Sequence, residues 1–266
     1  MNFGLEGKVV LVTGGSKGIG RSIAAAFARE GCRVVINARN SADLAKTAQE
    51  ISTAASKVQA IAADVTKPDD ASRLVAETVK LCGTIHVLVN NAGGVDKFAP
   101  FADITDQQWL DVFNLNFLSA VRVTRAALPH MQKQRWGRII NISSESGVQP
   151  DAQMPHYNMS KAALNNLTKS LSKAYGQEGI LVNTVSPAFI RTPLIDDFLG
   201  NIAREKKITA AEAEQEFLRE NRPNIVVRRA GEPDETAGIV VFLASEQASF
   251  ITGSNFRVDG GSVASV

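Results

Sequence analysis

The sequence predicts one α/β domain built on an open, parallel β-sheet with helices on both of its faces. Short apolar runs alternate with longer segments of helical periodicity along most of the 266 residues. This alternation is typical of βαβ units, whose right-handed crossovers place helices on both faces of the sheet. The runs at 9–12 and 87–89 are apolar throughout, as strands covered on both faces should be. Neither an internal repeat nor a linker divides the sequence, so we expect a single domain over residues 1–266.

The strands are expected where short runs of Val, Ile, Leu and Ala lie between polar segments. They are 9–13, 33–38, 58–63, 85–90, 138–143, 181–186 and 255–258. The segments between them have helical periodicity and predict helices at 18–30, 42–55, 68–82, 105–132, 153–177 and 233–245. Pro68 suits the first turn of its helix, and Thr105-Asp106-Gln107-Gln108 is typical of a capping box.

One segment, residues 189–229, breaks this rhythm. It carries a charged helical pattern at 210–220 that does not alternate with strands. We therefore expect a helical excursion from the domain at about 189–229.

Composition excludes several classes of protein. Lys+Arg 29 against Asp+Glu 27 gives a net charge of +2, so no nucleic-acid partner is expected. The two cysteines, Cys32 and Cys82, predict no disulfide framework, and no Cys/His cluster predicts a metal site. The sequence has neither a start typical of a signal peptide nor about 18 consecutive apolar residues, so we expect a cytoplasmic protein without a membrane partner.

The first strand runs into the glycine-rich turn Thr13-Gly14-Gly15-Ser16-Lys17-Gly18-Ile19-Gly20, and a helix follows. Glycines let the backbone turn tightly and approach a pyrophosphate, while the helix N-terminus supplies N–H groups and a positive dipole end. The spacing is not that of a Walker loop. The turn predicts a dinucleotide phosphate site, with a plain strand-to-helix turn as the alternative.

Tyr157 and Lys161 stand four residues apart in the helix expected at 153–177, so their side chains share one face. A phenol with its ordinary pKa of about 10 is a poor acid or base near neutral pH. A neighbouring ammonium lowers that pKa, and the phenol can then exchange a proton with a carbonyl or alcohol oxygen. Taken alone, the pair is better explained as part of an ordinary helix face.

Four motifs in order resemble the short-chain dehydrogenase/reductase family. They are the glycine turn, Asn90-Asn91-Ala92-Gly93, Ser144 and Tyr157-x-x-x-Lys161. The likeness runs from Lys8 to Gly261 and is greatest to reductases of the 3-oxoacyl-[acyl-carrier-protein] type and their relatives. It implies a Rossmann-type, doubly wound sheet of seven strands, hydride transfer between a nicotinamide and a carbonyl or secondary alcohol, and a homotetramer.

The resemblance also assigns roles to single residues. Tyr157 would be the general acid/base, with its pKa lowered by Lys161. Ser144 would hydrogen-bond the substrate oxygen, and Asn116 would hold a water of the proton relay, with Asn114 as the alternative. The implied coenzyme contacts are Gly14, Ser16, Lys17, Gly18, Ile19, Gly20, Arg39, Asp64, Val65, Asn91, Ala92, Gly93, Tyr157, Lys161, Ile190 and Thr192.

The end of the second strand distinguishes the two nicotinamide coenzymes. NAD(H) is usually held there by an acidic side chain, but this sequence has Asn37-Ala38-Arg39-Asn40. Arg39 can bind a 2′-phosphate in bidentate fashion, and Lys17 adds a second cation. We expect NADP(H) to be preferred, with NAD(H) possible if both cations are only solvated surface charges.

Two other functions remain open at the level of the sequence. One is an NAD-dependent catabolic dehydrogenase of a sugar, polyol or hydroxy acid. The other is a non-catalytic coenzyme-binding regulator, against which the intact set Asn116, Ser144, Tyr157 and Lys161 argues. The family's usual Pro-Gly after the sixth strand is Pro187-Ala188 here, which leaves the path of the chain at that point open. The excursion at 189–229 is expected to shape the pocket of a small-molecule substrate whose identity the sequence does not reveal.

Overall fold

The computed structural model describes residues 3–265, which fold around one parallel sheet of seven strands. The strand order is β3-β2-β1-β4-β5-β6-β7. The strands are β1 (Val9–Thr13), β2 (Arg33–Ala38), β3 (Gln59–Ala62), β4 (Val87–Asn90), β5 (Gly137–Ile142), β6 (Ile180–Pro187) and β7 (Asn255–Val258). The order reverses direction between β1 and β4, where Val10 pairs with both Val34 and Val87. The predicted doubly wound fold is confirmed.

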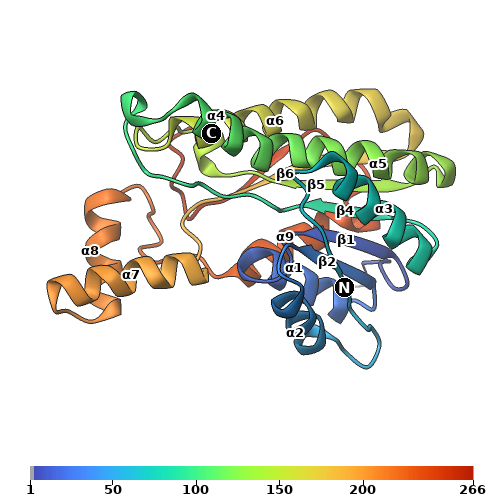
Figure 1. Ribbon diagram of the computed structural model, residues 1–266, viewed down its shortest axis with the longest axis horizontal. Coiled ribbons are helices and arrows are strands. Elements are labelled where there is room, and N and C mark those ends of the chain that lie inside the picture. The colour runs from blue at the N-terminus through green and yellow to red at the C-terminus, as the bar shows by residue number, and fades with distance from the viewer. Residues whose placement is uncertain (1–2, 266) are drawn as a thin grey trace.

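Helices cover both faces of this sheet, as Figure 1 shows. The α-helices of the chain are α1 (Gly18–Arg29), α2 (Ser41–Ile51), α3 (Pro68–Cys82), α4 (Asp106–Phe113), α5 (Ser119–Gln134), α6 (Pro155–Tyr175), α7 (Pro193–Lys206), α8 (Ala210–Asn221) and α9 (Pro233–Ala244). Side chains of α1, α2 and α9 form the core on one face, and those of α3, α5 and α6 pack on the other. Within residues 3–265, no helix is long and apolar enough to cross a membrane.

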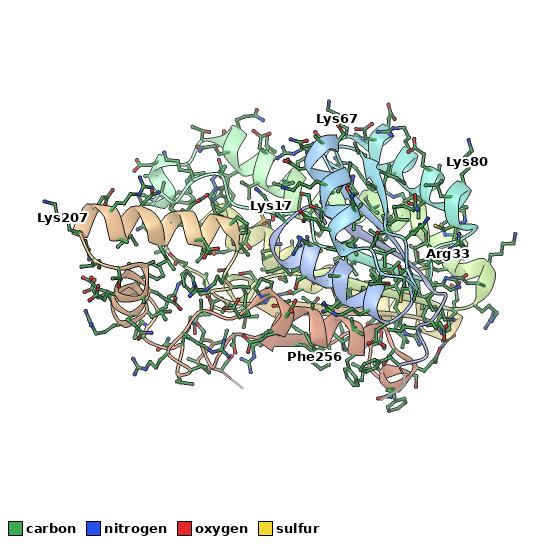
Figure 2. The ribbon with its side chains drawn as sticks, turned by 90° about the horizontal axis from the view of Figure 1, so that it is seen from below. Lys17, Arg33, Lys67, Lys80, Lys207 and Phe256 are labelled. Carbon is green, nitrogen blue, oxygen red and sulfur yellow. The ribbon has the colours of Figure 1, made fainter. Side chains whose placement is uncertain are left out.

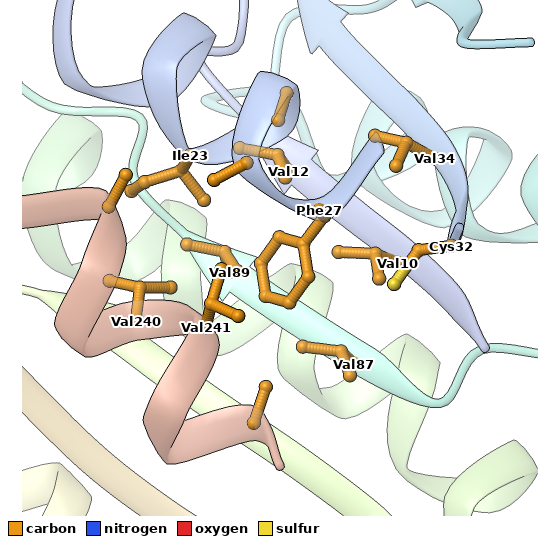
Figure 3. Close-up of a cluster of buried hydrophobic side chains, with 14 of the residues drawn as sticks. Val10, Val12, Ile23, Phe27, Cys32, Val34, Val87, Val89, Val240 and Val241 are labelled. Carbon is orange, nitrogen blue, oxygen red and sulfur yellow. The ribbon is translucent and has the colours of Figure 1, made fainter. Parts of the chain in front are cut away.

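Successive residues of β1 pack alternately into the two cores, because side chains along a strand point to opposite faces of the sheet. Val10 and Val12 join the first cluster, whereas Val9 and Leu11 join the second. The ring of Phe27, 0% exposed, lies at the centre of the first cluster among valines of β1, β4 and α9 (Figure 3). Burial on both faces keeps the sheet rigid and its carboxyl edge in one place.

Two expected helices have different bounds in the structure. The segment at 105–132 begins at the predicted capping box, but a π-helical turn at Asn114–Leu118 separates α4 from α5. The hydrophobic period alone does not reveal such a turn, because a single wide turn shifts it by only one residue. Helix α2 ends at Ile51 and not at 55, because Ser52 takes an extended backbone and donates its hydroxyl to Ala48 O at 2.7 Å.

The excursion contains two helices, of which the sequence predicted only α8. Helix α7 was not expected, because it buries only Leu199 and Ala203 and so has a weak apolar stripe. The pair projects from one end of the body (Figure 1). It packs around its own apolar cluster, formed by Phe189, Leu199, Leu218, Ile225 and Ala230. The α7–α8 unit is therefore a small subdomain added to the main fold.

Separate cores predict separate unfolding. Phe27→Ala should lower the global free energy of unfolding by about 3–5 kcal/mol, because it opens a cavity in the main core. Leu218→Ala should instead increase amide hydrogen exchange within α7 and α8 and leave exchange in the sheet unchanged. Hydrogen exchange followed by mass spectrometry, together with urea unfolding, measures both effects. Equal loss of protection throughout the sheet in Leu218→Ala would show that the unit is not independent.

Candidate active site

The loops after β1 and β4 are clamped together at the point where the strand order reverses. The Thr13 hydroxyl oxygen accepts from the backbone N–H groups of Asn91 and Ala92, each at 3.0 Å. The Asn91 amide donates in return to Thr13 O at 2.9 Å and to Gly14 O at 3.0 Å. In open α/β sheets, ligands bind in the crevice at such a switch point. The clamp therefore fixes the floor of the candidate site.

The glycine turn leaves bare backbone at the start of α1. A Cβ on Gly20 would lie 2.3 Å from Gly14 O and 2.4 Å from Asn91 Nδ2, so no larger residue fits. Lys17 is the N-cap residue of α1 in extended conformation, and its side chain makes no capping hydrogen bond. The first N–H groups of α1 are thus directed at a bare loop, an arrangement that suits a pyrophosphate. A dinucleotide fits these residues.

Lys17 and Arg39, the two cations predicted to bind the second phosphate, lie on neighbouring segments of the backbone. Gly15 N donates to Asn37 O at 2.9 Å, and Lys17 and Arg39 each follow this bond by two residues. Both side chains are exposed, and neither makes an ion pair or hydrogen bond with the part of the chain that the structure describes. Figure 2 shows Lys17 beside the inner end of α7. The Asn37 amide, in contrast, is buried and donates to Ile61 O and Ala63 O.

The residues expected around the adenine lie after β3. Asp64 is half-buried, and its Oδ1 accepts from both the N–H and the hydroxyl of Thr66. Val65 packs its side chain into the second core cluster. Its side chain is therefore structural, and only its backbone can face a coenzyme.

The nicotinamide end is expected where the chain leaves β6. Ile190 pairs with Gly231 in an isolated parallel bridge, and the Thr192 methyl lies 3.1 Å from where a Cβ on Gly18 would stand. Thr192 therefore borders the glycine turn, whereas Ile190 lies against Gly231. The departure at Pro187-Ala188 does not break the path, because Ala188 N still donates to Val258 O at 3.2 Å.

The structure brings Ser144, Tyr157 and Lys161 together at the carboxyl edge of the sheet. Ser144 caps a 3-10 turn that follows β5, and its hydroxyl is close enough to the Tyr157 side chain to lower the pKa of the phenol. Tyr157 lies in the first turn of α6, where Pro155 occupies the first position. Lys161 follows one turn later, with its Nζ 5.5 Å from the centre of the Tyr157 ring and donating to Ile142 O at 2.9 Å.

The predicted lowering of the Tyr157 pKa is wrong for this structure. Burial raises the pKa of Tyr157 to about 12, although the nearby Ser144 side chain opposes the rise. Lys161 directs its ammonium to the Ile142 carbonyl and does not offset the desolvation of the phenol. Burial lowers the pKa of Lys161 itself to about 8. The phenol is consequently protonated near neutral pH, and the lysine titrates close to it.

Asn116, and not Asn114, borders the same point as Lys161. The side chain of Asn116 lies in the π-helical turn, donates to Gly94 O at 2.8 Å and accepts from Gly94 N at 3.0 Å. A Cβ on Gly93 would meet Asn116 Oδ1 at 2.6 Å and Lys161 Nζ at 3.1 Å. Asn114 faces elsewhere, where its Oδ1 accepts from an arginine, Arg122, at 2.7 Å.

Two polar pairs near Tyr157 have no signal in the sequence, because their members are far apart along it. His156 is 0% exposed, lies edge-on to the Trp109 ring and contacts Asp96 Oδ1 through its Nε2 at 2.8 Å. Glu145 is buried directly after Ser144 and faces Arg222. Among residues 3–265, no three or more His, Cys, Asp or Glu side chains are grouped so that they could hold a metal ion.

Comparisons with known proteins identify a family for the sequence. Residues 8–200 match the family model described as short chain dehydrogenase. The chain is 35% identical to the uncharacterized oxidoreductase YvrD of Bacillus subtilis, with all of both chains covered. It is 34% identical to the 3-oxoacyl-[acyl-carrier-protein] reductase FabG of Thermotoga maritima, over 97% of this chain and 99% of the relative.

A solved structure is similar over the whole chain. It is that of L-sorbose reductase from Gluconobacter frateurii complexed with NADPH and L-sorbose, with a TM-score of 0.95, 32% identity and complete coverage of both chains. The glycine turn, the Ser144–Tyr157–Lys161 cluster and these matches lead to one conclusion. The chain belongs to the short-chain dehydrogenase/reductase family and is an oxidoreductase.

Proposed function

We propose that this protein is an NADP(H)-dependent carbonyl reductase that uses Tyr157 as its general acid. The proposal is carried by one observation: the Ser144, Tyr157 and Lys161 side chains lie together at the carboxyl edge of the sheet. The bound coenzyme would supply the hydride. The protein's own residues then have to hold the carbonyl oxygen and deliver one proton to it.

The pKa values favour the reductive direction. With its pKa raised to about 12, the Tyr157 phenol carries the proton that a reduced carbonyl oxygen needs. Ser144 and Tyr157 would together hydrogen-bond that oxygen as it gains negative charge. Lys161, with its pKa lowered to about 8, would return a proton to the phenol along a path past Asn116. The reverse reaction would require the phenolate, whose formation is costly in this buried site.

The proposed preference for NADP(H) rests on Arg39 and Lys17, which are both exposed cations. Each lies two residues after a member of the Gly15–Asn37 hydrogen bond, so their backbones are close together. The L-sorbose reductase, whose structure contains NADPH, supports the same preference. Two alternatives remain: an NAD-dependent dehydrogenase of a sugar, polyol or hydroxy acid, and a non-catalytic coenzyme-binding regulator. The homotetramer and the cytoplasmic location implied by the family resemblance stay predictions.

Tyr157→Phe should lower kcat for ketone reduction by at least about 10²–10³-fold, because the proton donor and one oxyanion contact are lost. The dissociation constant for NADPH should change little. Absorbance assays of NADPH consumption and fluorescence titration measure the two quantities. Tyr175→Phe is a matched control on the same helix, since Tyr175 packs against the second core cluster. Turnover of Tyr157→Phe at the level of this control would refute the mechanism.

Arg39→Ala should weaken NADPH binding by about 10-fold or more and NADH binding much less, because a charge-assisted contact to the 2′-phosphate is lost. Lys57→Ala removes an equally exposed cation before β3, away from the carboxyl edge, and serves as the control. Titration of both coenzymes against each variant gives the ratio of affinities. If the two coenzymes lose affinity equally in Arg39→Ala, the phosphate assignment is wrong.

Lys161→Met should stabilise the fold while abolishing activity. The folded-state pKa of Lys161, about 8, lies below its ordinary value of 10.5, so the buried ammonium opposes folding below about pH 8. That penalty is on the order of 3 kcal/mol. The variant also loses the hydrogen bond to Ile142 O, which costs about 1 kcal/mol and reduces the expected gain in the free energy of unfolding by that amount. The penalty vanishes as the pH rises from the folded-state pKa to the ordinary one, so the gain in stability should shrink over that range.

Urea unfolding of wild type and Lys161→Met at neutral pH and above the ordinary lysine pKa measures this stability difference. Lys173→Met, an exposed lysine of the same helix, controls for loss of charge. A variant no more stable than wild type at neutral pH would show that Lys161 is structural.

A further inference from the structure

The α7–α8 unit joins the body through two neighbouring segments. We call residues 188–192, between β6 and α7, the exit segment, and residues 228–232 lead from α8 back to α9. Arg191 N donates to Gly231 O at 2.8 Å, and Gly231 N donates to Phe189 O at 2.9 Å. The two connections therefore form one joint, from which α7 and α8 project (Figure 1).

A single buried carboxylate of α8 holds both sides of this joint. Glu214 is 6% exposed, and each of its two oxygens has a partner. Its Oε2 accepts from Arg191 Nη2, and its Oε1 accepts from Ala230 N at 2.8 Å. About one turn further along α8, the ring of Phe217 lies with its centroid 5.0 Å from that of Phe189. Helix α8 therefore fixes the exit segment through a buried ion pair and an aromatic contact.

This ion pair is better suited to fixing an orientation than to adding stability. Arg191 also faces Glu232 at 3.5 Å and Asp196 at 3.9 Å, but both carboxylates are exposed, and exposed ion pairs contribute little. Burying the charge of Glu214 costs desolvation, and apolar side chains of similar volume can stabilise a core equally well. A guanidinium donates in the plane of its fork, so a buried carboxylate restricts its orientation. The pair therefore sets the direction of the chain at Arg191.

The exit segment borders the path that a bound dinucleotide would take. One end of this path is the glycine turn, where the Thr192 methyl lies 3.1 Å from the position of a Cβ on Gly18. The other end is the cluster of Tyr157 and Lys161. Because Thr192 directly follows Arg191, the ion pair with α8 determines where this side of the path lies.

We propose that Glu214 is a positioning residue for the coenzyme: by holding Arg191, it fixes the exit segment against the nicotinamide half of NADP(H). The inference rests on the proposed reductase function and adds to it a residue that touches neither coenzyme nor substrate. Glu214 handles no proton of the reaction. The adenine half of the coenzyme is expected at Arg39 and Asp64, which belong to loops that the joint does not hold.

NADPH and 2′-phospho-ADP-ribose test this inference, because the second ligand lacks the nicotinamide. Calorimetric titration measures the dissociation constant of each for wild type and Glu214→Gln. The substitution keeps an acceptor for Ala230 N but removes the charge that holds Arg191. NADPH should bind the variant about 5–10-fold more weakly, which is the value of roughly one hydrogen bond, and the fragment should lose less than about 2-fold. A merely structural role would weaken the binding of both ligands equally.

Glu216→Gln is the matched control, because Glu216 lies on the same helix and pairs with Lys206 of α7, within the unit and not at the joint. Its affinity for both ligands should equal that of wild type. Thermal unfolding checks that Glu214→Gln is folded. If it is not, Arg191→Lys carries the same comparison, since it keeps the cation but loses the planar fork.

Unchanged NADPH binding in the folded variant, or equal losses for NADPH and the fragment, would overturn the inference and leave the reductase intact. If wild type binds neither NADPH nor the fragment, the proposed function itself fails.

Discussion

The hydrogen bonds between Thr13 and Asn91 are the interaction on which the candidate site depends. They join the loop after β1 to the loop after β4. At this point the order of the parallel strands across the sheet reverses: β2 and β3 follow on one side of β1, and β4 to β7 follow on the other. Because Asn91 also binds Gly14 O, the glycine turn cannot move without breaking the same clamp. Two residues later, Gly93 leaves no room for a Cβ between its backbone and the Asn116 and Lys161 side chains. The glycine turn and the surroundings of Lys161 are thereby placed by one short segment.

The second general feature is the number of polar groups buried without full compensation. Lys161 and Glu145 are both nearly inaccessible to solvent. Burial lowers the pKa of Lys161 and raises the pKa of Glu145, so the neutral form of each side chain is favoured. Asn116 occupies a π-helical turn, a less favourable geometry than a continuous helix. All three cluster near Tyr157, while the two main cores away from it are apolar and closely packed. Local instability of this kind is typical of functional sites.

Much of this arrangement could be predicted from the sequence. Strands β1, β2 and β7 and helix α3 have the predicted bounds, because apolar runs buried on both faces and a first-turn proline are local signals. The order of the motifs in the sequence is enough to predict that Ser144, Tyr157 and Lys161 lie at one edge. Their proximity follows from the parallel topology, in which all carboxyl ends of the strands meet.

What could not be predicted depends on contacts between distant segments. The pKa of Tyr157 was expected to fall because the spacing shows a nearby ammonium, but spacing does not show that Lys161 binds Ile142 O or how deeply the phenol is buried. Helix α7 lacks a broad apolar stripe and was missed. Glu145 meets Arg222 across 77 positions, a pairing with no local signature.

The separate apolar cluster of α7 and α8 has an evolutionary consequence. Substitutions there can accumulate without disturbing the packing of the sheet, and the segment from Ala210 onward already lies beyond the part that matches the family model. Arg222, which faces Glu145, directly follows α8. Changes in this peripheral pair of helices can therefore alter the surroundings of Glu145 while the packing of the sheet is kept.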